Sequence, residues 1–185
     1  MEAVSLTAQW TAAVRAVETR RGEDRLFADE LAHSLAEPDG YRLLDRYKGG
    51  GLTDFIAIRT KFFDLAISNA LRAAEIRQVV IVAAGMDTRA YRLLWPDGVR
   101  LYEVDHEALL SEKTRRLAAL GASSRVARVG VAADLSRPWR RRLIEAGFDL
   151  LAPTLWVAEG LVFYLEPHQA ADLLTELGEL SPAGS

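Results

Sequence analysis

The second half of the chain predicts an α/β fold in which a Rossmann-like parallel sheet carries helices on both faces. Apolar segments and helical patterns alternate there four times. The strand candidates cover residues 78–83, 100–105, 126–131 and 155–158, and the helical patterns cover 87–94, 107–120, 136–146 and 167–180. The segment 78–83 is apolar without a period of two, as is typical of a strand buried on both faces of a parallel sheet. Strands that alternate with helices in this way run parallel in one sheet.

The first half of the chain is predicted to be helical. Apolar residues recur at helical spacing in three segments, which cover residues 6–20, 26–35 and 53–75. Thr53 and Asp54 are candidate caps of the third and longest helix, whereas residues 38–40, Pro-Asp-Gly, indicate a turn.

The glycine-rich residues 48–51 mark a predicted internal boundary. Residues 1–51 are expected to form an N-terminal helical lid over residues 52–185, the ligand-binding Rossmann-like domain. The last residues, 181–185, are small and polar, and we expect them to be disordered.

Composition excludes several classes of protein. A net charge of −3 and a pI near 5.7 argue against a nucleic-acid partner, because binding phosphates needs a large basic surface. The chain has no cysteine, so disulfides, thiolate catalysis and cysteine-ligated metals are excluded, and its three histidines lack metal-ligand spacing. The start has no secretory signal, and the apolar run at 79–86 is too short to cross a bilayer. We therefore expect a cytoplasmic protein without a metal or a membrane partner.

Small or acidic residues follow each predicted strand, at the edge where open parallel sheets bind ligands. After the first strand come Ala83, Ala84 and Gly85, which let a ligand approach the backbone, and then Asp87. The alternative interpretation of this segment is a tight turn in which Asp87 caps the next helix.

The second strand ends in Glu103 and Asp105, and a carboxylate at its tip could accept hydrogen bonds from both hydroxyls of a ribose. After the third strand, Asp134 and Leu135 suit the amino group and the face of an adenine ring. Glu159 ends the fourth strand and could meet a cationic ligand group, since a buried glutamate without a partner is costly. For each of these acids, a helix cap or a salt bridge is the alternative.

These four strand ends together indicate a ligand that carries an adenosine and a positively charged amine. The chain has no Gly-x-Gly-x-x-Gly turn, so a nicotinamide-dependent oxidoreductase is a weaker hypothesis. It also lacks the Gly-Lys-Ser/Thr of a phosphate-binding loop, and Asp87 would repel a pyrophosphate. An adenosine ligand without phosphates fits best, and S-adenosyl-L-methionine is the common one.

Four segments resemble the leucine carboxyl methyltransferase-like family of class I S-adenosylmethionine-dependent O-methyltransferases. They cover residues 58–64, 83–93, 102–105 and 159–165, and the resemblance extends over most of the chain, from about Thr7 to Leu180. It implies transfer of a methyl group to a carboxylate or hydroxyl of a small molecule or a protein C-terminus. It assigns no catalytic residue to this chain.

The resemblance also implies roles for single residues. Arg59 would pair with the carboxylate of the cofactor's methionine, and Glu159 would face its amino group. Gly85, with Ala83 beside it and Asp87 following, would approach the methionine portion. Members of the family usually have glycine where this chain has Ala83. We expect the extra methyl group to weaken binding modestly, or to be tolerated if Ala83 keeps a negative φ.

On the adenosine side, the resemblance implies that Asp105 holds the ribose, with Glu103 as the weaker candidate. Asp134 and Leu135 would flank the adenine.

Length is the largest departure from the resemblance. The family usually has about a further third of chain and seven strands, whereas only four strands are predicted here. We therefore expect a fold truncated after the fourth strand, with an exposed sheet edge that favours pairing with another chain, for example in a homo-oligomer. The alternative function is an inactive cofactor-binding remnant, or an interaction module that uses this edge.

Overall fold

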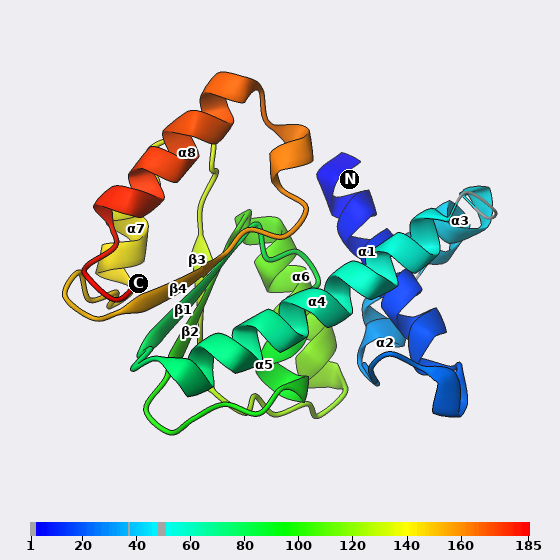
Figure 1. Ribbon diagram of the computed structural model, residues 1–185. Helices are drawn as coiled ribbons and strands as arrows, with labels where there is room; N and C mark the ends of the chain where they lie inside the picture. Colours follow the sequence, from blue (N-terminus) through cyan, green and yellow to red (C-terminus); the bar gives the residue numbers. More distant parts are fainter. Residues whose placement is uncertain (1–2, 37, 48–50) are drawn as a thin grey trace.

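Four parallel strands form the sheet at the centre of the molecule, in the order β3-β2-β1-β4 (Figure 1). In this computed structural model, residues 3–36, 38–47 and 51–185 are described. The strands are β1 (Gln78–Val82), β2 (Arg100–Asp105), β3 (Ala127–Ala132) and β4 (Thr154–Val157). All five residues of β1 are buried, as predicted for a central strand. The predicted α/β fold is confirmed.

Helices cover both faces of the sheet. On one face, α7 (Arg140–Glu145) and α8 (Pro167–Glu179) pack on inward side chains such as Val80 and Tyr102. On the other face, α4 (Leu52–Ala73) and α5 (Arg89–Arg92) pack on Val79 and Leu101. Helix α6 (Glu107–Ala119) connects β2 to β3 in the chain and contacts β3.

The N-terminal helices form an apolar cluster of their own beside the sheet, in addition to the clusters on its two faces (Figure 1). They are α1 (Ala3–Thr19), α2 (Ala32–Ala36) and α3 (Asp39–Arg46), with a short 3₁₀ turn at Gly22–Asp24. Trp10 and Val14 of α1 pack with Leu35 and Leu44, and Met86 from the turn after β1 joins the same cluster. The N-terminal helices therefore share their core with the loop that follows β1.

Two local predictions in this part are wrong. The helix expected at 26–35 begins only at Ala32, and the turn expected at 38–40 is the start of α3. Pro38 has helical dihedral angles and its ring fixes φ, so Pro-Asp-Gly begins a helix here. Gly40 is needed for close packing, because a Cβ there would lie 2.2 Å from the backbone oxygen of Gln9 in α1. The boundary expected at 48–51 falls mostly outside the described residues.

Local hydrogen bonds shorten two of the expected helices. Asp134 accepts hydrogen bonds from the backbone and hydroxyl of Ser136, which delays the start of α7. Asp87 accepts a bond from the backbone N–H of Arg89, where α5 begins. Helix α4 begins after Gly51 without a side-chain cap, so the caps predicted from its first residues are not formed.

The C-terminal residues, predicted to be disordered, lie against β4. Ser185 Oγ accepts a hydrogen bond from the backbone N–H of Thr154, and Ser181 Oγ accepts one from Trp156 Nε1. They therefore contact both the backbone and a side chain of the edge strand.

Among the described residues, no helix combines the length and apolar character that crossing a membrane requires.

Candidate functional site

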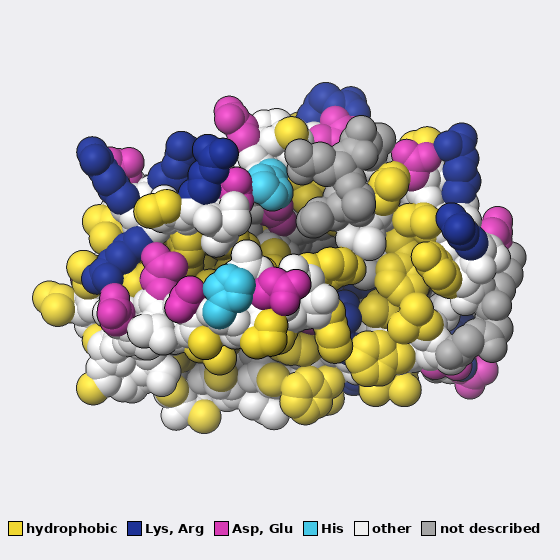
Figure 2. Space-filling model, turned by 90° about the horizontal axis from the view of Figure 1, so that it is seen from above, with side chains coloured by type: hydrophobic (Ala, Val, Ile, Leu, Met, Phe, Trp, Pro, Cys, Tyr) yellow, Lys and Arg dark blue, Asp and Glu magenta, His cyan; other side chains and the backbone are white. Residues whose placement is uncertain are grey.

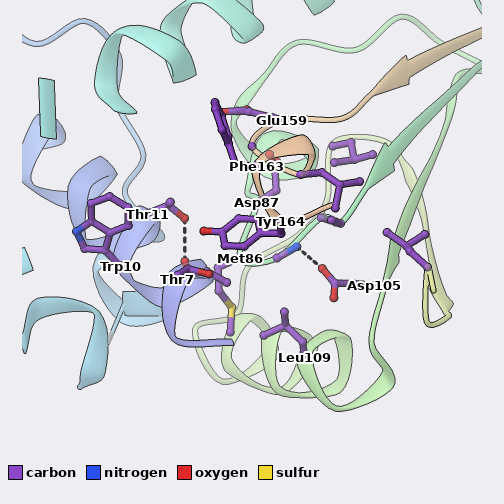
Figure 3. A pocket seen from close by; sticks show the side chains of 18 of the residues that line it. Thr7, Trp10, Thr11, Met86, Asp87, Asp105, Leu109, Glu159, Phe163 and Tyr164 are labelled. Atoms are coloured by element: carbon purple, nitrogen blue, oxygen red, sulfur yellow. Dashed lines mark hydrogen bonds between the residues drawn. The ribbon is translucent and has the colours of Figure 1, made fainter. Parts of the chain in front are cut away.

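A cavity of about 750 Å³ lies over the carboxyl ends of the strands, within the usual size range of small-molecule sites. Its wall combines the residues after each strand with α1, the first turns of α4 and the segment from β4 to α8. Thr7, Trp10 and Thr11 of α1 lie across the cavity from Asp105 (Figure 3). Hydrophobic side chains cover much of the face seen from above (Figure 2).

The turn after β1 is built on left-handed backbone. Gly85 has φ +50°, and Ala83 has φ +56°, the one positive φ among the described residues other than glycine. The condition under which the extra methyl group of Ala83 would be tolerated, a negative φ, is therefore not met. Left-handed backbone costs an alanine about 1–2 kcal/mol, so this turn is strained where the resemblance leads one to expect glycine. A Cβ on Gly85 would lie 3.2 Å from the Cβ of Ala8, because α1 packs directly on the turn.

Asp105 joins the ends of β1 and β2. Its Oδ2 accepts a 2.7 Å hydrogen bond from the backbone N–H of Gly85 (Figure 3), and its Oδ1 accepts one from the backbone N–H of His106. The residue lines the cavity, where a carboxylate can receive the two hydroxyls of a diol.

Asp134 and Leu135 also line the cavity, beside His106. Hydrogen bonds from the hydroxyl and backbone N–H of Ser136 lower the pKa of Asp134 below its ordinary value. Asp134 therefore stays a carboxylate at neutral pH and can accept hydrogen bonds.

Glu103 is not brought to the cavity. Its side chain is fully buried and accepts 2.8 Å hydrogen bonds from Lys113 Nζ of α6 and from Arg128 Nε of β3. It does point to the same side of the strand as Asp105, but it lies within the sheet, whereas Asp105 is at the tip. Because α6 covers Glu103, Asp105 is the better placed of the two candidate ribose ligands.

Glu159 is held by two arginines at the wall of the cavity. Arg59 Nε of α4 lies 2.8 Å from Glu159 Oε1, and Arg89 Nη2 lies 2.7 Å from Glu159 Oε2. Gly160 permits this contact, because a Cβ on it would lie 3.2 Å from Nη1 of Arg59. Arg59 and Glu159, the pair predicted to hold the methionine end of the cofactor, are thus within one hydrogen bond of each other.

Arg89 connects three carboxylates. In addition to Glu159, its guanidinium lies 2.8 Å from Asp64 and 2.6 Å from Asp87. Burial alone would raise the pKa of Asp87, but Arg89 and nearby cations lower it to about 2. Burial likewise opposes the charge of Arg89, yet Asp87, Glu159 and Asp64 raise its pKa above the ordinary value. Asp87 and Arg89 are therefore both charged at neutral pH.

The network continues into the N-terminal helices. Arg15 of α1 pairs with Asp29 at 2.8 Å and donates a 2.5 Å hydrogen bond to the backbone oxygen of Met86. Asp29 also accepts a bond from the hydroxyl of Thr88, and Arg92 pairs with Asp64. These contacts attach the N-terminal helices to the turn after β1.

The sequence pointed to only part of this network. Arg89 and Asp64 lie in the segments that carry the family resemblance, but no role was predicted for them. Arg15 and Asp29 had no local signal, because their partners are brought close only by the fold. The aromatic residues Phe163 and Tyr164, which line the cavity after β4, were also missed as site residues.

The sheet order and the cavity at the strand ends define the chain as a Rossmann-like α/β protein. The family model described as Leucine carboxyl methyltransferase matches residues 8–178, and the chain belongs to this family.

Its relatives include provisionally named S-adenosyl-L-methionine-dependent methyltransferases of three bacteria. The Saccharopolyspora erythraea protein is 42% identical over 189 residues, which cover 98% of this chain and 65% of the relative. The Mycobacterium marinum protein is 40% identical and the Parafrankia sp. protein 43% identical, each over 98% of this chain and over 64% and 61% of the relative. The chain thus spans a little under two thirds of these relatives.

Proposed function

We propose that this chain binds S-adenosyl-L-methionine and belongs to an O-methyltransferase that acts on a carboxylate or hydroxyl. The observation that carries the proposal is the cavity at the strand ends, where Asp105 stands at one end and the pair Arg59–Glu159 at another. Relatives at about 40% identity are provisionally named S-adenosyl-L-methionine-dependent methyltransferases, which supports the cofactor and the transfer of a methyl group.

The chemistry of these side chains fits the cofactor. Its methionine end carries one ammonium and one carboxylate, which match Glu159 and the guanidinium of Arg59. Its ribose offers two hydroxyls to Asp105, and its adenine fits between an acceptor, Asp134, and the apolar side chain of Leu135. The cofactor has no phosphate, so the turn after β1 needs neither a cluster of lysines nor a phosphate-binding glycine loop.

The cofactor, when bound, supplies a methyl group made electrophilic by a sulfonium. In the proposed reaction the acceptor oxygen forms a bond to the methyl carbon while the carbon–sulfur bond breaks and its electron pair stays on sulfur. A carboxylate acceptor is already ionised at neutral pH and needs no base, whereas a hydroxyl acceptor needs a base to take its proton. The residues of the chain contribute by holding the reactants in line and excluding water.

Aromatic and aliphatic side chains form the remaining wall of the cavity. They come from α1, α4 and the segment after β4, and include Trp10, Phe55, Phe163 and Tyr164. Phe163 is 80% exposed and Tyr164 is 59% exposed, so their rings are available to a ligand. This wall supports an acceptor with an apolar body.

Binding and transfer are measured separately to test the proposal. Calorimetric titration should show binding of S-adenosyl-L-methionine and of its demethylated product, S-adenosylhomocysteine, and no comparable binding of NAD. Binding of NAD alone would reverse the assignment. Transfer of a labelled methyl group into a panel of aromatic and aliphatic carboxylic acids and phenols would then identify the acceptor.

A second candidate function rests on β4, which stands at the end of the strand order among the described residues. Its outer edge pairs with no further strand among the described residues, and only Ser185 is seen to accept a backbone hydrogen bond there, from Thr154. This edge and the greater length of the relatives support pairing with another chain segment or a second copy. Sedimentation of the purified chain tests this: a dimer supports edge pairing, and a monomer across the micromolar range argues against it.

A further inference from the structure

Glu159 is held from two sides by arginines that differ in burial and in number of partners. The side chain of Arg59 is 17% exposed and lines the cavity, and within the described part of the chain its one ion pair is with Glu159. The side chain of Arg89 is 2% exposed and makes ion pairs with Glu159, Asp87 and Asp64. A ligand can therefore replace the contact of Arg59 far more easily than that of Arg89.

We propose that Arg89 is a positioning residue that fixes Glu159 and Asp87 at the cavity wall so that both carboxylates face the amino group of the bound cofactor. This inference rests on the proposed function. Arg89 also borders the cavity, but its side chain is only 2% exposed, so its role is exerted through the two more exposed carboxylates that line the cavity with it.

Geometry fixes Asp87 relative to Arg89 twice. The Oδ1 atom of Asp87 accepts a 2.6 Å hydrogen bond from the backbone N–H of Arg89, and its Oδ2 atom lies 2.6 Å from Arg89 Nη1. The guanidinium is itself anchored by Asp64 of α4 and lies 6.0 Å from the centre of the Phe63 ring. The guanidinium of Arg89 therefore holds the carboxylates of Asp87, after β1, and Glu159, after β4, in a fixed position relative to each other.

Charge gives the arrangement its preference for a cation. The three carboxylates Asp64, Asp87 and Glu159 are paired with three arginines, Arg59, Arg89 and Arg92, so their charges balance in the chain without a ligand. Once Arg59 pairs with the carboxylate of the methionine end, the remaining groups carry one net negative charge, which attracts an ammonium. When Arg59 turns to the carboxylate of the methionine end, Glu159 retains Arg89 and does not become an unpaired charge. Arg59 is the exchangeable partner and Arg89 the permanent one.

The experiment compares two ligands that share the adenosine and the thioether but differ in the amino-acid end. S-adenosylhomocysteine has the amino group, and 5′-methylthioadenosine lacks it. In the full chain, Arg89→Gln should weaken S-adenosylhomocysteine at least tenfold in calorimetry and change 5′-methylthioadenosine by less than twofold. Arg89→Lys, which restores the charge without the planar geometry, should recover part of the loss.

Arg92→Gln is the matched control. Arg92 lies on the same short helix, pairs with Asp64, and has its other ion pair with Asp29 at 3.9 Å. This variant should lower the melting temperature and leave the affinity ratio of the two ligands as in the parent chain.

Three outcomes are informative. If a folded Arg89 variant loses affinity equally for both ligands, or for neither, the positioning role is overturned. If Arg89→Gln does not fold, the same comparison is made with Arg89→Lys. Failure of the parent chain to bind S-adenosylhomocysteine would instead defeat the proposed function, so the two failures are distinguishable.

Discussion

Glu103 and Glu159 are each held by two cations, but the two regions of the molecule in which they lie are built differently. Glu103, under α6, is fully buried, and so is its partner Lys113. Glu159, at the cavity, is 12% exposed and its partner Arg59 is 17% exposed. Both glutamates are therefore ion-paired, and they differ in that Glu159 lines the cavity whereas Glu103 does not. A carboxylate becomes a candidate ligand where one of its partners can be exchanged.

The largest effect is expected from breaking the pair under α6. Lys113→Met leaves Glu103 with Arg128 alone in a buried position, and removing one partner of a buried pair costs about 3 kcal/mol or more. Urea unfolding measures the loss, while the affinity for S-adenosylhomocysteine in the folded protein should not change. Arg115→Met, which removes an exposed pair on the same helix, is the control and should leave the unfolding midpoint unchanged.

Glu159→Gln should show the reverse pattern. The neutral amide keeps the shape of the side chain but loses its charge, and a hydrogen bond to a charged group contributes roughly 2 kcal/mol, or about thirtyfold in affinity. Calorimetry with S-adenosylhomocysteine measures this loss. An unchanged dissociation constant would mean that Glu159 is a structural acid like Glu103.

Gly160→Ala sharpens the comparison by displacing Arg59 without removing a charge. Gly160 has φ +74°, and the new Cβ would meet the guanidinium of Arg59 at 3.2–3.4 Å. Gly121→Ala is the matched control, because Gly121 has φ +64° and nothing lies within 4 Å of its Cβ position. Each variant should lose about 1 kcal/mol of stability from backbone strain, but only Gly160→Ala should also weaken cofactor binding.

The smallest effect is expected at the turn after β1. Ala83→Gly relieves left-handed strain of about 1–2 kcal/mol and increases the backbone entropy of the unfolded chain by about 0.5–1 kcal/mol. The net gain should be about 0.5 kcal/mol, seen as a small rise in melting temperature. A fall in melting temperature would show that the methyl group of Ala83 contributes more by packing than its backbone costs.

Much of the fold could be predicted from local pattern. The strands predicted at 78–83 and 100–105 match β1 and β2 to within a residue. The first was predicted because a strand buried on both faces needs a continuous apolar segment. The N-terminal part was predicted less well. Gly40 lies in a helix rather than a turn because α3 crosses α1 closely there, and this contact has no counterpart in local sequence.

The sequence alone determined the strand–helix alternation and the placement of Asp105, Asp134 and Glu159 after strands whose ends meet at one edge. Period and spacing are properties of neighbouring residues, and parallel pairing then brings the strand ends together. Tertiary structure alone decided that α6 covers Glu103 while Glu159 reaches the cavity. It also decided which charged residues form ion pairs, since Arg59 and Glu159 are 100 positions apart in the chain. Which charges are buried, paired or open to a ligand depends on what packs over them, and only the folded chain specifies that.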